Sequence, residues 1–165
     1  MENKIVTTSV KYPFQNFYEA IEKNAKHLKN KPIIFEDDIK ISHIQLKEYV
    51  DSFAKYLELL GVGKDDKVAI LMTNSKEFII SFLAIGKLGA VPVPINTFLK
   101  RNEIEYIIKN SDSKILITQE KFKDELKGIL HSITSLKKII WSGDVDSILD
   151  ACRYDVFTEI FRKAQ

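Results

Sequence analysis

The sequence predicts an α/β fold in which a mostly parallel sheet is flanked by helices. Two observations favour this class. Short apolar runs typical of strands alternate along the chain with longer segments whose apolar residues recur at helical spacing. The strand-like runs also have few polar interruptions, as in a sheet that is covered on both faces. Because 165 residues suffice for one domain with its own core, we expect residues 1–165 to form a single α/β domain.

The first segments predict a helix followed by a hairpin. Apolar residues at helical spacing run over residues 14–28, and Pro32 breaks that pattern. The runs PIIFED, from residue 32, and IKIS, from residue 39, then indicate two short strands around Asp37 and Asp38. We therefore expect a small antiparallel hairpin before the second helix.

The second helix is predicted to begin at Ser42. Gln45 stands three residues later, and in such a capping box each side chain satisfies a backbone N–H group of the first turn. One apolar face continues from there to Leu60. Gly61 is expected to end the helix, where a residue with left-handed backbone is favoured.

The rest of the chain alternates between strand and helix patterns, which implies parallel strands joined by right-handed crossovers. Asn74 with Glu77 is a second capping combination. The helix that it opens is apolar nearly all round and should be buried. The expected strands are KVAILM (67–72), AVPVPI (90–95), KILIT (114–118) and KKIIW (137–141), and the expected helices are 75–88, 102–110 and 120–130, followed by a helical tail at 144–165.

Composition and charge exclude several classes of function. Lysine and arginine total 25 against 23 acidic residues, and the basic residues are scattered among acids, so nucleic acid is not an expected partner. Cys152 is the only cysteine. It is expected to be a small core residue in a protein of a reducing, cytoplasmic setting. The most apolar window, 78–95, contains a lysine, two glycines and two prolines, so no transmembrane segment is expected.

The stretch Gly86-Lys87-Leu88-Gly89 allows two interpretations. A phosphate-binding loop requires the order strand, glycine-rich turn, helix, because the backbone N–H groups that hold phosphate lie at a helix N-terminus. Here a helix precedes the glycines and a strand follows them. We therefore expect a structural joint in which Gly86 lets neighbouring backbone approach closely, Lys87 complements the helix C-terminus, and Gly89 turns the chain. A direct phosphate contact is the alternative.

Asn96 and Thr97 are the best candidates for substrate-binding residues. They follow the predicted strand 90–95, and ligands of α/β proteins bind at the carboxyl edge of the sheet. We expect them to line a pocket there. The sequence assigns no catalytic, cofactor-binding or metal-binding residue.

Other polar residues have ordinary structural interpretations. His27, His43 and His131 are far apart, without the spacing of metal ligands, and are expected at the surface. Asp65 and Asp66 are expected to lie in a solvated turn before a strand.

Residues 41–118 resemble the N-terminal region of the adenylate-forming, AMP-binding enzymes, which include acyl-CoA synthetases, nonribosomal adenylation domains and luciferases. The matching motifs are GVGKDDKVAI (61–70), Asn-Ser-x-Glu (74–77) and KLGAVPVPIN (87–96), where the family commonly has Lys-x-Gly-Ala-x-x-x-Pro-Ile/Leu-Asn/Asp. The resemblance extends over about residues 14 to 142. Within the family it is closest to fatty acyl-CoA synthetases, the long-chain fatty acid–CoA ligases, or to aryl-CoA ligases.

The resemblance implies a parent enzyme that joins a carboxylate to ATP, giving an acyl-adenylate and pyrophosphate, and then passes the acyl group to coenzyme A. Such a parent would use ATP, Mg²⁺ and CoA, in fatty acid metabolism if the closest resemblance holds. The family's Ser/Thr/Gly-rich nucleotide loop ending in Pro-Lys-Gly, and its later nucleotide motifs, do not occur in this sequence. We therefore expect an N-terminal subdomain that binds no cofactor and is not active alone.

Two alternatives to a ligase fragment remain. One is a non-catalytic interaction module derived from such an enzyme, whose apolar tail would bind a partner. For a fragment, the expected partner is the remainder of the parent, and a homodimer through exposed apolar surface is possible. The other is a flavodoxin- or receiver-like domain, which the motifs disfavour because neither an acidic cluster after the first strand nor a Ser/Thr-rich phosphate loop is present.

Overall fold

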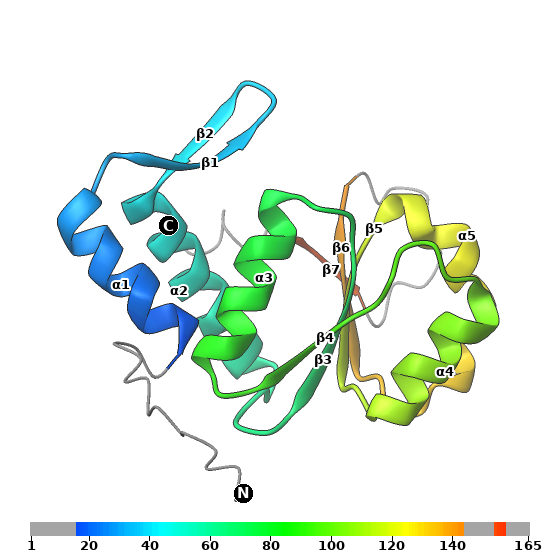
Figure 1. Cartoon of the computed structure of the whole chain (residues 1–165). Helices are drawn as coiled ribbons and strands as arrows, with labels where there is room; N and C mark the ends of the chain where they lie inside the picture. Colours follow the sequence, from blue (N-terminus) through cyan, green and yellow to red (C-terminus); the bar gives the residue numbers. More distant parts are fainter. Residues whose placement is uncertain (1–15, 144–153, 158–165) are drawn as a thin grey trace, which may run out of the picture.

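The computed structural model describes residues 16–143 and 154–157. A five-stranded sheet at the centre carries helices on both faces, and a two-stranded hairpin projects from one end (Figure 1). This confirms the predicted α/β class with a parallel sheet flanked by helices. The helices are α1 (Phe17–Leu28), α2 (His43–Leu59), α3 (Lys76–Lys87), α4 (Arg101–Ser111) and α5 (Lys123–Leu126), with short 3-10 helices η1 (Glu120–Phe122) and η2 (Leu130–Ser132). The strands are β1 (Pro32–Glu36), β2 (Ile39–Ser42), β3 (Lys67–Leu71), β4 (Val91–Pro94), β5 (Ile115–Gln119), β6 (Lys138–Ser142) and β7 (Tyr154–Val156).

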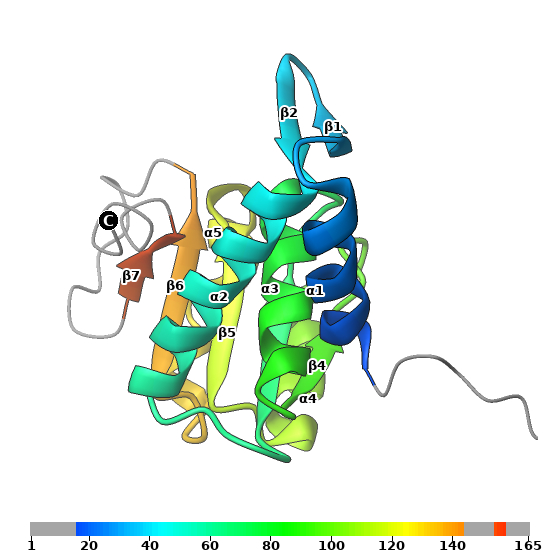
Figure 2. The same ribbon diagram turned by 90° about the vertical axis from the view of Figure 1, so that its left-hand side faces the viewer.

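The first helix and the hairpin form where the sequence predicts them. α1 is capped by Asn16, whose side chain accepts a hydrogen bond from the Glu19 N–H at 2.9 Å. Strands β1 and β2 pair antiparallel, with Phe35 opposite Lys40. The hairpin projects beyond the ends of the helices, and α1 forms an outer layer over α2 and α3 (Figure 2).

The predicted limits of α2 are confirmed by its caps. The Ser42 side chain accepts a hydrogen bond from the Gln45 N–H, and the Gln45 side chain accepts one from the Ser42 N–H. At the other end Gly61 has a φ of 82°, as expected for a residue that ends a helix.

All five strands of the main sheet are parallel, in the order β4-β3-β5-β6-β7. Counted by their appearance along the chain this is 2-1-3-4-5, the order of flavodoxin-like sheets. The order reverses at β3, because β4 lies on one side of it and β5 on the other. In such sheets ligands bind outside the carboxyl ends of the strands at the point of reversal.

The sheet separates two cores, because side chains alternate between the faces of a strand. Ile70 on β3 faces α2 and α3, whereas its neighbours Ala69 and Leu71 belong to the core under α4 and α5. Val50, Phe53, Leu57, Ile80, Ile85, Ile117, Ile140 and Phe157 lie in the first core, and Ile104, Ile108, Leu116, Phe122, Leu126, Ile133 and Trp141 lie in the second. Burial on both faces explains the nearly continuous apolar runs of the sequence.

Strand β4 lies at the edge of the sheet and carries two prolines. The N–H groups of Val91 and Ile95 donate to β3 and the loop before it, at 2.8 Å each. Pro92 and Pro94 occupy the intervening positions, whose N–H groups would point away from the sheet. Proline is tolerated there because an edge strand has no further partner.

Two details of α3 differ from prediction. Its cap is Ser75 and not Asn74, because the Ser75 side chain accepts the hydrogen bond from the Phe78 N–H. The helix is also not fully buried. Ile80 and Ile85 lie in the core, but Ile79 is exposed, since α1, α2 and the sheet together leave part of the helix surface open.

Two predicted helices are wrong in the described residues. Residues 120–130 form η1 and the short α5 and not one helix, because the backbone becomes extended at Lys127. In the predicted helical tail, Tyr154–Val156 instead form β7, which pairs with β6 with Val156 opposite Trp141. The backbone groups of these residues pair with those of β6 at the edge of the sheet. The other residues of 144–165, except Phe157, lie outside the described part, and so does Cys152.

Candidate functional site

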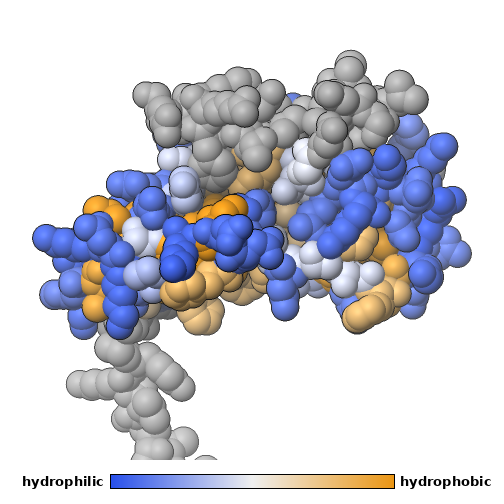
Figure 3. Space-filling model, turned by 90° about the horizontal axis from the view of Figure 1, so that it is seen from above, coloured by the Kyte–Doolittle hydropathy of each residue, from blue (hydrophilic) through white to orange (hydrophobic). Residues whose placement is uncertain are grey.

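A pocket of about 670 Å³ lies at the carboxyl ends of β3 and β4. It is formed by the segment after β3, the segment after β4 and one side chain of α3. Figure 3 views this end of the molecule and shows apolar residues lying between hydrophilic ones. The lining residues are Met72, Thr73, Asn74, Phe78, Pro94, Ile95, Asn96, Thr97 and Phe98.

Asn96 and Thr97 both line this pocket, so the structure places them at the sheet edge that the sequence indicated. The Asn96 side-chain oxygen accepts a hydrogen bond from the Phe98 N–H at 3.0 Å. Phe98 itself is 88% exposed. A substrate-binding role for Asn96 and Thr97 stays a prediction.

A set of polar contacts joins the ends of β3 and β5 beside the pocket. The Gln119 side-chain oxygen accepts hydrogen bonds from both the N–H and the hydroxyl of Thr73, each at 3.0 Å. The Lys121 ammonium group donates to the Thr73 hydroxyl at 2.6 Å. These contacts bridge the point where the strand order reverses, and they place one positive charge next to Thr73.

The pocket lining has no ionisable side chain. Its amide and hydroxyl groups can donate and accept hydrogen bonds, and its apolar groups can cover a hydrophobic part of a ligand. Neither a nucleophile with a base nor a cluster of cations lines it. In the described residues, no group of three or more His, Cys, Asp or Glu side chains is placed to hold a metal ion. The arrangement can position an uncharged part of a ligand.

The sequence reasoning missed Met72–Asn74, Gln119 and Lys121. The signal was available, because these residues directly follow the apolar runs of β3 and β5. Parallel strands end at the same edge of a sheet, so polar residues after each strand belong to one neighbourhood. Of these strand ends, only that of β4 was predicted to contribute to a site.

The stretch from Gly86 to Gly89 is a joint between α3 and β4, as the sequence favoured. α3 ends at Lys87, and Gly89 has a φ of 68°. The expected reason for Gly86 is wrong, since a Cβ atom there would have no atom outside its own helix within 4 Å. The joint lies at the opposite end of α3 from the pocket, where a helix presents carbonyl groups and not N–H groups.

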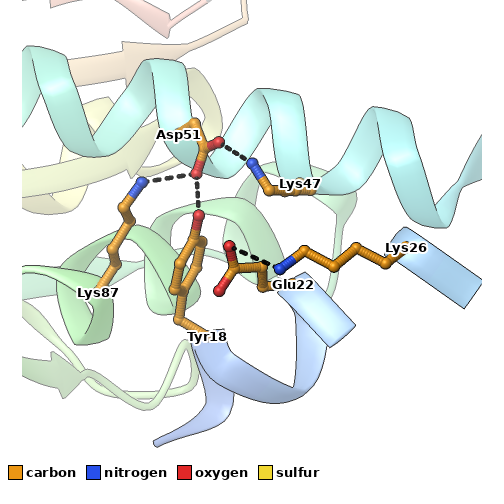
Figure 4. Close-up of polar contacts among 6 residues, drawn as sticks. All are labelled: Tyr18, Glu22, Lys26, Lys47, Asp51 and Lys87. Atoms are coloured by element: carbon orange, nitrogen blue, oxygen red, sulfur yellow. Dashed lines mark hydrogen bonds and ion pairs between the residues drawn. The ribbon is translucent and has the colours of Figure 1, made fainter. Parts of the chain in front are cut away.

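Lys87 does more than complement a helix end. Its ammonium group lies 2.6 Å from Oδ1 of Asp51 on α2 and 4.4 Å from the ring centre of Tyr18 on α1. The Tyr18 hydroxyl donates to the same Oδ1 at 2.6 Å, and Lys47 donates to Oδ2 at 2.5 Å. Figure 4 shows this Asp51 cluster, with the separate ion pair of Glu22 and Lys26 beside it.

The Asp51 cluster shifts the ionisation of its members. Burial and the hydrogen bond to Asp51 raise the pKa of Tyr18 to about 12. Burial pushes the pKa of Asp51 upward, but hydrogen bonds from Lys47, Lys87 and Tyr18 outweigh it and hold that pKa below its ordinary value. The cluster joins three helices on the outside of the sheet, so its role is structural.

The remaining candidates are placed as follows. His27 and His131 are exposed, but the prediction for His43 is wrong, because it is buried at the start of α2.

The Asp66 carboxylate accepts a hydrogen bond from the Gly63 N–H at 2.9 Å and pairs with Lys114. The turn is therefore braced by contacts and not merely solvated. In the described residues, no helix is long and apolar enough to cross a membrane.

Comparison with known families decides the wider assignment. Residues 21–154 match the family described as AMP-binding enzyme. The chain belongs to the AMP-binding enzyme family. The chain carries the Lys87–Asn96 motif on α3, β4 and the pocket loop, so the family resemblance inferred from the sequence is confirmed.

The relatives named here are CoA ligases. A 2-succinylbenzoate–CoA ligase of Oceanobacillus iheyensis is 36% identical over 132 residues, 72% of this chain and 28% of the relative. A long-chain-fatty-acid–CoA ligase of Mycobacterium tuberculosis is 42% identical over 80 residues, 48% of this chain and 16% of the relative.

Solved structures of ligases share the fold of this chain. The anthranilate CoA ligase AuaEII, in complex with anthranoyl-AMP, superposes with a TM-score of 0.84 at 27% identity, over 93% of this chain and 29% of that chain. Coronafacic acid ligase of Pectobacterium brasiliense gives a TM-score of 0.83 at 26% identity, over 89% and 29%. The chain therefore spans less than a third of each of these four relatives.

Proposed function

We propose that this chain is the N-terminal part of an ATP-dependent acyl- or aryl-CoA ligase. The parent would form an acyl-adenylate from a carboxylate and ATP, with Mg²⁺, and then transfer the acyl group to CoA. The observation that carries the proposal is the family match over residues 21–154, supported by relatives named as CoA ligases. The partner of this part is then the remainder of the parent polypeptide, in the cytoplasm.

The carboxylic acid that the parent activates is proposed to be a fatty acid or an aromatic acid. If it is a fatty acid, the parent acts in fatty acid metabolism. This finer statement is supported by the two kinds of relative, one named for 2-succinylbenzoate and one for long-chain fatty acids. None of the relatives named here is a binding module, so the interaction-module alternative has no support.

Asn96 and Thr97 are proposed to contact an uncharged portion of a substrate in the parent. Their pocket has hydrogen-bonding groups and apolar surface but no ionisable lining residue. In phosphoryl and adenylyl transfer the developing charge is met by positioned cations and metal ions. Since no cationic side chain lines the pocket, we expect the 165-residue chain alone to catalyse no adenylate formation.

The test begins with the reading frame downstream of the codon for Gln165. We expect it to continue into a Ser/Thr/Gly-rich loop and Pro-Lys-Gly. The uninterrupted frame should then catalyse carboxylate-dependent exchange of pyrophosphate into ATP, and the 165-residue chain should not. Exchange by the short chain, or a full-length product without ligase activity, would contradict the proposal.

The proposed role of Asn96 is tested in the full-length parent. Asn96→Ala should raise a substrate KM about two- to tenfold, the loss expected for one hydrogen bond. The matched control is Asn30→Ala, another exposed asparagine that is not part of the pocket lining, which should leave KM unchanged. An Asn96→Ala enzyme with unaltered KM for the acid and for CoA would remove Asn96 from the site.

A further inference from the structure

The carboxyl ends of β3 and β5 lie on either side of the point where the strand order reverses. α3, which follows β3, packs on one face of the sheet, and α5, which follows β5, packs on the other. The two segments therefore diverge from neighbouring strand ends. In flavodoxin-like sheets a ligand binds at this position, so the polar side chains found there are candidates for ligand contacts.

Lys121 is the cationic residue held at this position. It follows β5, and its ammonium group donates to the Thr73 hydroxyl at 2.6 Å and lies 5.5 Å from the ring centre of Phe122. The Thr73 hydroxyl is fully used, because it also donates to Gln119 at 3.0 Å. An ammonium group has three N–H donors. Thr73 accepts from one of them, which leaves two for a ligand.

The charge of Lys121 is not neutralised in the part of the chain that the structure describes. No acidic side chain there forms an ion pair with it, and the neighbouring carboxylate of Glu120 lies 3.5 Å from Lys123 instead. The residue that Lys121 contacts, Thr73, lines the pocket at the ends of β3 and β4. The pocket lining has no ionisable side chain, so Lys121 places an available positive charge one residue away from an uncharged site.

We propose that Lys121 binds an anionic group, a carboxylate or a phosphate, of a ligand whose uncharged part lies in the pocket beside Asn96. The choice of ligands rests on the proposed function, in which the carboxylic acid and CoA both combine an anionic group with an uncharged part. Lys121 then determines specificity, because it favours a charged ligand over an uncharged one. Gln119 is a positioning residue, since it fixes the hydroxyl that Lys121 contacts.

Ligand binding to the 165-residue chain tests the proposal. Each anionic probe is compared with an uncharged counterpart, hexanoate with hexanamide and CoA with pantetheine, and the amide chemical shifts of Thr73 and Asn96 report occupancy. We expect an anion to bind about five- to tenfold more tightly than its counterpart, the gain from one partly exposed charged hydrogen bond. A preference for hexanoate identifies a carboxylate site, and a preference for CoA identifies a phosphate site.

Lys121→Met should remove this preference and leave the affinity for the uncharged counterpart unchanged, whereas Lys121→Arg should retain it. The matched control is Lys127→Met, which removes another exposed lysine that is not part of the pocket lining and should retain the preference. The preference should also weaken at about 1 M salt, where the Debye length falls to about 3 Å.

Two results overturn the proposal. One is the absence of saturable binding by either anion, or equal affinities for each anion and its counterpart in the unaltered chain. The other is an equal loss of affinity for both members of a pair in Lys121→Met, which would show that the contact with Thr73 only maintains the shape of the pocket.

Kinetics of the full-length parent give a second test. Lys121→Met should raise KM for the acid or for CoA about five- to tenfold with little change in kcat, and Lys121→Arg should restore it. An active parent with unchanged KM for both substrates overturns the inference but not the proposed function. A parent without pyrophosphate exchange contradicts the proposed function, and the binding result on the 165-residue chain then decides the inference alone.

Discussion

Gly86 and Gly89 are three residues apart, yet they differ in what a side chain would cost. Gly86 lies within α3, where a Cβ atom would meet nothing within 4 Å. Gly89 has a φ of 68°, and a Cβ atom there would lie 3.5 Å from Lys64 Cγ. The space is sufficient at both sites, so only the backbone conformation distinguishes them.

Gly86→Ala is expected to stabilise the fold by about 0.5–1 kcal/mol, because alanine favours helix over glycine by that amount. Gly89→Ala should destabilise it by about 1–2 kcal/mol, the cost of left-handed backbone for a residue with a Cβ atom. Urea unfolding of both variants checks the pair. A loss of stability in Gly86→Ala would show that Gly86 has a packing role.

Asp51→Asn is expected to reduce stability by about 1–3 kcal/mol at pH 7, because Lys47 and Lys87 lose a charged acceptor. The folded pKa of Asp51 is depressed, so its contribution is present above the unfolded pKa of about 3.9 and is lost as pH falls through the folded value. The difference from the unaltered chain should therefore shrink below about pH 4.

Urea unfolding between pH 3 and 7 measures this pH dependence. Glu58→Gln is the control, since it breaks the exposed pair of Glu58 and Lys55 and should change stability little at any pH. A constant difference between Asp51→Asn and the unaltered chain would mean that the Asp51 charge does not contribute.

Residue-level features with a local cause were predictable from the sequence, and those with a distant cause were not. The capping box of Ser42 and Gln45 and the joint at Gly89 depend on neighbours within a few positions. The contact of Lys87 with Asp51 depends on how α2 packs on α3. The burial of His43 likewise depends on the hairpin and loop around the start of α2. Spacing along one chain segment contains no information on such contacts.

At the scale of elements, the ion pair of Glu36 with Lys76 connects the hairpin to α3. The Glu36 carboxylate on β1 accepts hydrogen bonds from the Lys76 N–H at 3.2 Å and from the Lys76 ammonium group at 2.6 Å. The hydrogen bond from the Lys76 side chain is the main cause that lowers the pKa of Glu36. A two-stranded hairpin is marginal alone, so we expect this contact at the start of α3 to stabilise it, together with the buried Ile34 and Ile41.

Glu36→Gln should therefore speed amide exchange in β1 and β2 severalfold while exchange in β5 stays unchanged. Exchange measured by mass spectrometry on peptides from both regions checks this. The control is Glu19→Gln on α1, away from the hairpin. Unchanged exchange in the hairpin would show that Ile34 and Ile41, which are buried, hold it without Glu36.

Elements with a strong periodic pattern were predicted at nearly the right limits, and those held by tertiary contacts were not. The apolar spacing within α2 and the apolar run of β3 were each sufficient to predict the element. Residues 154–156 form strand β7 because they pair with the edge of β6. The apolar spacing of these residues did not indicate that pairing. Asn96 and Thr97 were found by their place after β4, but the pocket needs the ends of β3 and α3 as well, which only the strand order brings together.

At the scale of the whole molecule, the two cores share one sheet. Ile70 lies in the core under α2 and α3, and Trp141 lies in the core under α4 and α5. β3 contributes to both, so loss of one core should disrupt the other.

Ile70→Ala should cost about 2–5 kcal/mol, and the loss should appear equally in circular dichroism and in the fluorescence of Trp141, the single tryptophan. Leu59→Ala, at a residue that is 74% exposed, should change neither. Two separate transitions in Ile70→Ala would contradict the view that the sheet makes the cores one cooperative unit.

The prolines of β4 also affect the tendency of the molecule to aggregate through the edge of its sheet. An exposed sheet edge is a template on which another chain can add a strand, and this is a common route to aggregation. Without N–H groups at positions 92 and 94, the β4 edge presents acceptors but no regular row of donors to an incoming strand. Intermolecular sheet growth is therefore disfavoured along this edge of the described sheet.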